Sequence, residues 1–238
     1  MCAAINRSLE QGVPLTDPKF YGKISEGELD QLFMGDDNVP CPMIKQRVHC
    51  LHEIAQVLEQ SYSGAFYNAL LKCGQSATKL VQIITQDFPC FNDRAMYKGK
   101  SVCFHKRAQI LVADLWQLFE GQDVCHFDDI DDITMFADYR VPQSLQYFGV
   151  FEYSDELLEF LKGADHVMDN GDAREVEIRG CSIAAVERIL QRVNDKLKDN
   201  KQKMNAIQLD NFLWSFRREK AQEMQLHHPY HRVRSIYY

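Results

Sequence analysis

The sequence predicts a mainly α-helical fold, formed as one domain over residues 1–238. Three observations support this prediction. In most segments the apolar residues recur every three or four positions, as on a helix with one buried face. Serine residues precede several of these segments, where they can cap a helix. Alternation of apolar and polar residues, which is typical of strands, occurs only weakly at Val102 and Phe104, after a turn at residues 97–100.

The first part of the chain contains four predicted helices. One begins at Ser25, because Ser25 and Glu28 have the spacing of a capping box, and it can end at Gly35. A longer helix follows Pro42, and two more follow the Gly64 region, the second of them capped by Ser76. Their apolar faces consist of Leu29, Leu32 and Phe33; of Ile44, Val48, Leu51, Ala55 and Leu58; of Phe66, Leu70 and Leu71; and of Leu80, Ile84 and Phe88.

The central helix is predicted over residues 106–120, with Gly121 after it. Lys106 and Arg107 lie at its N-terminal end, where a cation opposes the helix dipole. They form either a solvated surface pair or a pair that faces an anion, whose charge would make their position favourable.

The stretch 136–143 places a carboxylate, a phenol and a guanidinium on consecutive residues. Apolar residues at helical spacing over 130–136 predict a helix, and Pro142 should end it near Arg140 and begin another. Asp138 would then lie at the joint, where unpaired N–H groups and the helix dipole keep it a carboxylate at neutral pH. It either caps the second helix and pairs with Arg140, or it is a functional carboxylate.

Four aspartates precede this stretch, at Asp128, Asp129, Asp131 and Asp132. A calcium loop would need a central glycine and a closing glutamate, and both are missing. Capping and the helix dipole explain acidic residues at a helix start, so no metal site is predicted.

The last part of the chain is also predicted to be mainly helical. A helix opens at Ser154, and an extended stretch over 176–182 leads into a long helix capped by Ser182. A charged linker at 196–203 separates this helix from another amphipathic one over 209–216.

Two features of this part could bind an anion. Arg179 and Gly180 precede the predicted start of the long helix, although Gly180 can equally supply only the turn. The stretch 227–238 is rich in His, Arg and Tyr, and it is either a phosphate-binding segment or a solvated tail, the latter being favoured.

The composition is that of an ordinary soluble globular protein, with 45% hydrophobic and 26% charged residues. The net charge of −7 argues against a general nucleic-acid binder, and no apolar run approaches the ~20 residues of a membrane span. Residues 1–7 lack the order of a secretory signal, and the eight cysteines form no C-x-x-C pair. Reduced thiols in the cytoplasm, or also in the nucleus, are therefore expected.

Common catalytic motifs are missing: no nucleophile elbow, P-loop, dinucleotide fingerprint or histidine–glutamate zinc motif occurs. What is left is one positioned carboxylate beside aromatic and cationic side chains. Such a set suits cleavage of a glycosidic bond, because a fixed anion stabilises positive charge that develops on the sugar. Phe136 and Tyr139 could stack on a base, and lysine or arginine could hold a phosphate. From the residues alone this is one permitted interpretation.

Residues 136–143, FADYRVPQ, resemble the signature of the queuosine salvage proteins, the queuosine 5′-phosphate N-glycosylase/hydrolases. Further stretches are similar to the same family in the same order: CAAINR at 2–7, KRAQILVADLW at 106–116, DITMFADYRVPQ at 132–143, EVEIRGCS at 175–182, LDNFLW at 209–214 and HRVRSIYY at 231–238. The resemblance covers essentially the whole chain, and several long motifs in a fixed order are a specific signal.

The resemblance implies hydrolysis of the N-glycosidic bond of queuosine 5′-monophosphate, with release of queuine for insertion into tRNA by a separate enzyme. It implies a fold similar to helix-hairpin-helix DNA glycosylases and Asp138 as the catalytic carboxylate. The substrate-binding positions that it implies are Lys106, Phe136, Tyr139, Arg140, Glu177 and Asp210. No cofactor, metal, membrane or direct nucleic-acid partner is expected, and the chain is expected to be a monomer.

One departure from the family concerns the start of the chain. Family members carry a further region before CAAINR, with an aromatic motif that helps to wall the pocket, whereas Met1 here falls where that region should have ended. The alternative expectation is therefore an impaired, truncated relative that only binds a modified nucleoside or nucleotide and that exposes apolar surface. A weaker alternative, based on fold analogy alone, is a nucleic-acid glycosylase.

Overall fold

The computed structural model describes residues 2–35, 38–163, 165–197 and 203–238. This part of the chain is mainly helical, as predicted, with a single two-stranded hairpin. The elements are α1 (Cys2–Glu10), α2 (Pro18–Tyr21), α3 (Glu26–Phe33), α4 (Ile44–Ser61), α5 (Phe66–Cys73), α6 (Ala77–Asp87), η1 (Pro89–Phe91), β1 (Arg94–Tyr97), β2 (Lys100–Cys103), α7 (Lys106–Leu118), η2 (Asp123–Cys125), η3 (Ile130–Asp132), α8 (Val141–Tyr147), α9 (Asp155–Lys162), α10 (Ala173–Lys196), α11 (Ala206–Glu219) and α12 (Ala221–His227). The similarity to helix-hairpin-helix glycosylases and the assignment of one domain stay predictions.

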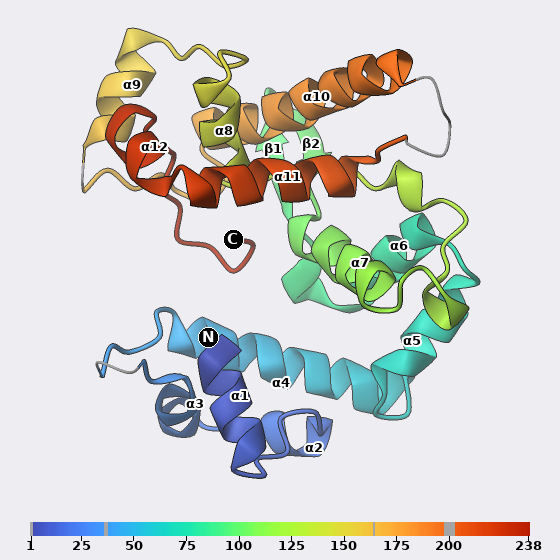
Figure 1. Cartoon of the computed structure of the whole chain (residues 1–238). Helices are drawn as coiled ribbons and strands as arrows, with labels where there is room; N and C mark the ends of the chain where they lie inside the picture. The colour runs from blue at the N-terminus through green and yellow to red at the C-terminus, as the bar shows by residue number, and fades with distance from the viewer. Residues whose placement is uncertain (1, 36–37, 164, 198–202) are drawn as a thin grey trace.

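The helices form two groups joined at one side (Figure 1). Helices α1 to α4 pack together in one group, and α8, α10, α11 and α12 pack together in the other. Helices α5, α6 and α7 join the groups, and the segment after α12 returns to the space between them. This return matters for the site, because it brings residues 229–238 next to the start of α7.

Local capping signals identified several helix starts correctly. The Ser25 hydroxyl accepts from the N–H of Glu28 at 3.2 Å, and the Glu28 carboxylate accepts from the N–H of Ser25 at 2.8 Å, which completes the capping box of α3. Ser76 caps α6 and Ser154 caps α9, as predicted. These starts depend on residues three apart in sequence, so the sequence alone was sufficient to locate them.

The acidic run does cap a helix, but not one that follows it in the chain. Asp129 lies at the start of α6, where its carboxylate accepts from the N–H of Ala77 at 2.5 Å and from the hydroxyls of Ser76 and Thr78 at 2.8 and 2.5 Å. Burial acts to raise the pKa of Asp129, but these donors outweigh it and the pKa is lowered. The segment 128–132 is thereby fastened to a helix about 50 positions earlier.

We expect Asp129→Ala to lower the free energy of unfolding by about 1–2 kcal/mol, the usual cost of losing a helix cap. Because the folded-state pKa is lowered, the contribution of Asp129 is present near neutral pH and is lost as the pH falls through that pKa. Urea unfolding at pH 7 measures the effect. Asp128→Ala is the matched control, because the neighbouring Asp128 side chain is 76% exposed. Equal stability of the two variants would contradict the role of Asp129.

The predicted turn and extended stretch form the β1–β2 hairpin. The strands pair in antiparallel register, with Tyr97 opposite Lys100 and Ala95 opposite Val102. Lys98 and Gly99 close the hairpin, both with positive φ, at 48° and 76°. Phe104 follows β2 and is buried against the second helix group.

The helix predicted over 130–140 does not form, and this prediction was wrong. Only the short η3 is helical, and the chain then passes through the core without regular structure as far as α8. Ile133 and Phe136 belong to the core cluster around α6 and α7, whereas Met135 and Ala137 belong to the cluster around α8, α10 and α11. Because this segment has apolar contacts on both sides, an extended path buries more apolar surface than a helix with a single apolar face would.

The prediction for 176–182 was also wrong, because these residues lie inside α10. Asp172, rather than Ser182, caps this helix, accepting from the N–H of Arg174 at 2.9 Å. Ser182 instead donates its hydroxyl to the carbonyl of Ile178 at 2.7 Å, and Gly180 lies on an exposed face where a side chain would meet nothing within 4 Å. The predicted linker 196–203 lies largely outside the described residues. No helix in the described part combines the length and apolar character needed to cross a bilayer.

Candidate active site

Asp138 is buried at the start of α8, with an exposed fraction of 8%. One of its oxygens, Oδ1, accepts from the backbone N–H groups of Arg140 at 2.8 Å and Val141 at 2.7 Å. Burial raises the pKa of Asp138, and the Lys106 ammonium and the two N–H groups oppose this rise. The predicted position near the helix start is therefore confirmed. Of the alternative in which Asp138 caps the helix and pairs with Arg140, the described residues show the cap, and Arg140 contributes its backbone N–H to it.

Lys106 is the first residue of α7 and is 9% exposed. Burial lowers the pKa of its ammonium group, and the negative charges of Asp138, Asp93 and Asp210 act against that effect. Lys106 therefore faces anions, which explains why a buried cation is placed at the unfavourable end of a helix dipole. Arg107 points elsewhere, donating to the carbonyl of Ile236 at 2.9 Å.

Asp210 brings a second carboxylate to the site from α11. It accepts from the N–H of Phe136 at 3.0 Å, so it also fixes the irregular segment that leads to Asp138. Burial, and next the negative charge of Asp138, raise the pKa of Asp210 to about 7. The site thus contains two interacting carboxylates and one ammonium group, all of them buried.

Aromatic rings and guanidinium groups surround this buried set. The Tyr139 ring lies 5.5 Å from that of Tyr230 and 6.1 Å from that of Tyr238. Arg140 lies over Tyr139 and Tyr230, at 4.9 and 4.1 Å from the ring centres. Rings and cations in this arrangement can contact the flat base and the phosphate of a nucleotide.

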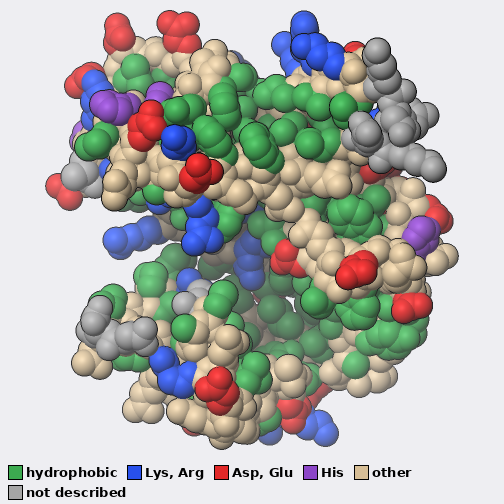
Figure 2. Space-filling view, viewed as in Figure 1, with side chains coloured by type: hydrophobic (Ala, Val, Ile, Leu, Met, Phe, Trp, Pro, Cys, Tyr) green, Lys and Arg blue, Asp and Glu red, His purple; other side chains and the backbone are tan. Residues whose placement is uncertain are grey.

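Arg140 and Arg217 converge on one neutral acceptor. The amide oxygen of Gln143 accepts from Nη1 of Arg140 at 3.0 Å and from Nε of Arg217 at 3.1 Å. Burial, and next the charge of Arg140, lower the pKa of Arg217. Among the described residues neither guanidinium forms an ion pair with a carboxylate. Figure 2 shows the surface hollowed between the two helix groups, with Lys and Arg side chains in the hollow.

The structure brings together most, but not all, of the residues predicted from the sequence. Lys106, Asp138, Tyr139, Arg140 and Asp210 meet at one place. The side chain of Phe136 packs mainly into the core cluster around α6 and α7, and it is the backbone of Phe136 that meets Asp210.

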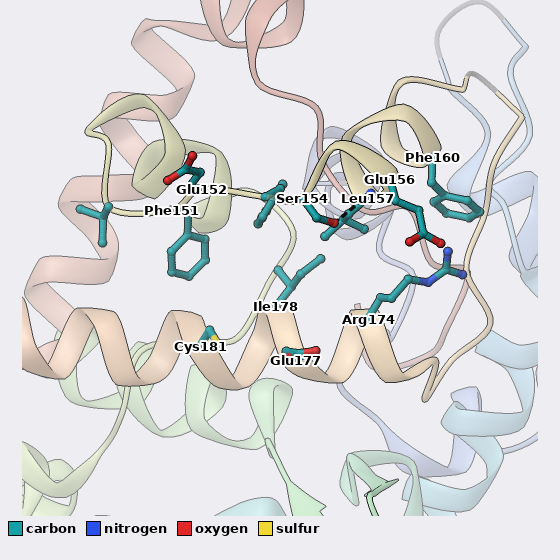
Figure 3. A pocket seen from close by; sticks show the side chains of 12 residues that line it. Phe151, Glu152, Ser154, Glu156, Leu157, Phe160, Arg174, Glu177, Ile178 and Cys181 are labelled. Carbon is teal, nitrogen blue, oxygen red and sulfur yellow. Dashed lines mark hydrogen bonds between the residues drawn. The ribbon is translucent and has the colours of Figure 1, made fainter.

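Glu177 is not part of this cluster, because it is exposed on another face of α10. There it lines a cavity of about 820 Å³, together with Phe151, Glu156 and Arg174 (Figure 3). None of the clustered residues lines that cavity. The candidate site is therefore identified by the convergence of buried charged groups, and it lies apart from this cavity.

Several site residues were not assigned from the sequence. They are Asp93, Gln143, Glu175, Arg217, Tyr230 and His231. Glu175 and Arg179 are four apart, which is the spacing of an ion pair on a helix, but the prediction of an extended stretch there concealed it. For Asp93 and Arg217 no local pattern points to the site.

Comparison with known proteins identifies the family. A family model described as queuosine salvage protein matches residues 1–238. The chain belongs to the queuosine salvage protein family. A Mus musculus relative is 45% identical over 242 residues, which span 100% of this chain and 71% of the relative. A Schizosaccharomyces pombe relative is 40% identical, and the match spans 100% of this chain and 70% of the relative. A relative from Sphaerobacter thermophilus is 38% identical, and the match spans 100% of this chain and 71% of the relative. All three are named queuosine 5′-phosphate N-glycosylase/hydrolase.

Family membership confirms the resemblance stated from the motifs. This chain spans about 70% of the length of these relatives. Their common name describes an enzyme that acts on an N-glycosyl bond, in agreement with the reaction class inferred from the carboxylate.

Proposed function

We propose that the chain hydrolyses the N-glycosidic bond of queuosine 5′-monophosphate and releases queuine. The observation that supports this most directly is the buried Asp138 carboxylate, set against Lys106 and Asp210 and near two guanidinium groups that form no ion pair among the described residues. A nucleotide offers the complementary features: a phosphate for the cations, a base for the rings, and a sugar that becomes positively charged as the bond breaks.

In this proposal Asp138 stabilises the positive charge that develops on the sugar ring. Its Oδ1 is held by two N–H groups, which leaves Oδ2 to face the sugar or a water molecule. A carboxylate so fixed needs no rearrangement during the reaction, so its full electrostatic effect is available in the transition state. The same oxygen can take a proton from the attacking water.

Asp210 is proposed to hold the proton that the pair shares near neutral pH. Two adjacent buried carboxylates do not both ionise readily, and Asp138 accepts two N–H groups and faces Arg140, whereas Asp210 accepts one. The carboxylate form therefore resides on Asp138 and the protonated form on Asp210. A protonated Asp210 can supply a proton to the departing base.

If Asp210 supplies a proton, the activity of the wild-type chain should fall above pH about 7, and we expect Asp210→Asn to lower kcat by about 100-fold and to remove that fall. The same substitution should raise the stability of the fold above neutral pH. A carboxyl with a folded-state pKa of about 7 against 3.8 costs stability as the pH rises between these values, by up to about 4 kcal/mol. Asp210→Asn should therefore unfold at a higher temperature than the wild type at pH 8, but not at pH 4.

Activity and melting profiles over pH 4–9 would measure both effects. The Asn amide oxygen can still accept from the N–H of Phe136, so the local fold should persist. An unchanged fall in activity above neutrality in this variant would show that another group titrates.

The other proposals concern partners. We propose that the substrate is the free nucleotide and that the chain acts as a monomer without direct contact to nucleic acid, consistent with a net charge of −7. Salt-dependent binding of tRNA or DNA would contradict the proposal that the chain makes no direct contact with nucleic acid. Sedimentation of the chain tests the proposal that it is a monomer.

A further inference from the structure

Arg179 is the most deeply buried positively charged side chain next to the site, with 1% exposure. It is the seventh residue of α10 and so lies inside the helix, not ahead of its first turn as the sequence had indicated. Its Nη1 and Nη2 donate to the two oxygens of Asp93 at 3.1 and 2.5 Å, and Nη1 also donates to Glu175 at 3.1 Å. Its Nε donates to the carbonyl of Ala137 at 2.9 Å.

These bonds reach the two chain segments that bear the functional charges. Ala137 directly precedes Asp138, so the bond from Nε fixes the backbone beside the carboxylate. Asp93 accepts from the backbone N–H of Lys106 at 3.4 Å through Oδ2, and its carbonyl accepts from the N–H of Phe104 at 3.0 Å. One planar guanidinium therefore links the start of α7, which carries Lys106, to the segment that carries Asp138.

Tyr238 completes this arrangement from the segment after α12. Its hydroxyl donates to Glu175 at 2.6 Å, and its ring lies 4.9 Å from the guanidinium of Arg179 and 5.5 Å from the ammonium of Lys106. Since the single hydroxyl proton goes to Glu175, Nε2 of His231, at 3.1 Å, must donate to the phenol oxygen. Burial lowers the pKa of His231 to about 3, and its Nδ1 has no partner among the described residues, so the ring is neutral and carries its proton on Nε2.

A purely stabilising role does not account for the cluster. Two carboxylates and a guanidinium are withdrawn from water here, and such buried ion pairs commonly add little stability compared with apolar residues of equal volume. What the cluster does supply is a fixed distance between two segments that are about 30 positions apart in the chain, at Lys106 and Asp138.

We propose that Arg179 and Tyr238 are positioning residues, which hold Lys106 and Asp138 in the relative place that the reaction needs. This inference rests on the proposed function for its kinetic consequences, but not for its structural ones. Arg179 acts through Ala137 and Asp93, and Tyr238 acts through Glu175 and His231 by keeping Arg179 in place.

Tyr238→Phe tests the proposal with the smallest change, because it removes one hydroxyl and keeps the ring. We expect kcat to fall on the order of 10-fold while KM for queuosine 5′-monophosphate and the melting temperature stay close to the wild-type values. Arg179→Lys keeps the charge but cannot reach Ala137, Asp93 and Glu175 together, so we expect a fall on the order of 100-fold. Tyr67→Phe on α5, where the residue is 53% exposed, is the matched control and should leave kcat unchanged.

A second measurement is independent of turnover. Titration of ¹³C-labelled aspartate carboxyls by NMR reports the midpoint for Asp210, which is lowered by the charge of Lys106. If the cluster holds Lys106 in place, this midpoint should rise in Tyr238→Phe and Arg179→Lys and stay constant in Tyr67→Phe.

The two measurements separate the possible outcomes. No release of queuine by the wild-type chain would overturn the proposed function, and the Asp210 midpoint would still test the positioning role. Wild-type kcat together with an unchanged midpoint in Tyr238→Phe would overturn the positioning role, and so would a kcat that falls only in proportion to the folded fraction. If Arg179→Lys does not fold, Tyr238→Phe still decides the question.

Discussion

Asp138→Asn should reduce queuine release from queuosine 5′-monophosphate by at least about 1000-fold while leaving the chain folded. The substitution removes the negative charge that would stabilise the sugar cation, and it keeps an oxygen that can accept from the N–H groups of Arg140 and Val141. Because burial raises the pKa of Asp138, a neutral side chain at this position should not destabilise the fold. Release of the base is followed by mass spectrometry, and folding by circular dichroism and thermal unfolding.

The matched control is Asp17→Asn, which makes the same chemical change at another helix start. Asp17 caps α2 on the surface, accepting from the N–H of Lys19 at 2.9 Å. Asparagine caps helices equally well, so both activity and stability should be preserved in this control. Turnover by Asp138→Asn within about 10-fold of the wild type would remove Asp138 from the proposed mechanism, since the loss of a fixed charge should cost more.

The same pair of proteins separates an enzyme from a chain that only binds a nucleotide. An impaired relative would bind queuosine 5′-monophosphate without forming product, whatever residue occupies position 138. An enzyme with the proposed mechanism would form product in the wild type, and its Asp138→Asn variant would bind the nucleotide and retain it intact. Calorimetric binding followed by mass analysis of the same sample distinguishes these cases.

The double substitution Arg140→Gln with Arg217→Gln should lower kcat/KM for queuosine 5′-monophosphate by at least about 100-fold, mostly through KM. Both guanidinium groups donate to the Gln143 amide oxygen and form no ion pair in the part of the chain that the structure describes, so they can form charge-assisted bonds to a phosphate. Each such bond contributes about 1.5–3 kcal/mol, which corresponds to roughly 10- to 100-fold for each arginine. Steady-state kinetics with the 5′-monophosphate and with the dephosphorylated nucleoside measures the effect.

The comparison of the two substrates supplies the internal control. The nucleoside has no phosphate, so its kcat/KM should change little in the double variant. Arg188→Gln, at an exposed position of α10, should affect neither substrate. An equal loss for nucleoside and nucleotide would show that the arginines support the site as a whole and do not recognise the phosphate.

The sequence alone was sufficient for the fold class and for most helix positions. Capping at Ser25, Ser76 and Ser154, and apolar spacing on α4, α7 and α11, involve residues within one or two helical turns of each other. Interactions of that range are nearly independent of the rest of the chain. The motif around Asp138 likewise indicated the family. It also indicated the start of α8, because Pro142 and the Asp138 carboxylate, which accepts from the first N–H groups of the helix, are close in sequence.

The tertiary structure alone decided how the charges at the site are arranged. Met135 and Ala137 pack in one core cluster, whereas Ile133 and Phe136 pack in another. Packing on both sides outweighs the helical spacing of residues 130–136. In the same way, Gly180 and Ser182 resemble a helix start in sequence, yet Asp172 and the buried pair of Glu175 with Arg179 place them inside α10.

The perturbed pKa values have the same origin. Lys106, Asp138, Arg179, Asp210 and Tyr238 come from five different parts of the chain, and their mutual burial, more than their local sequence, shifts their pKa values. Electrostatic energies depend on distance and on exclusion of water, and both are properties of the folded chain. The sequence could therefore indicate the carboxylate of Asp138, and only packing could supply the partners that shift its pKa.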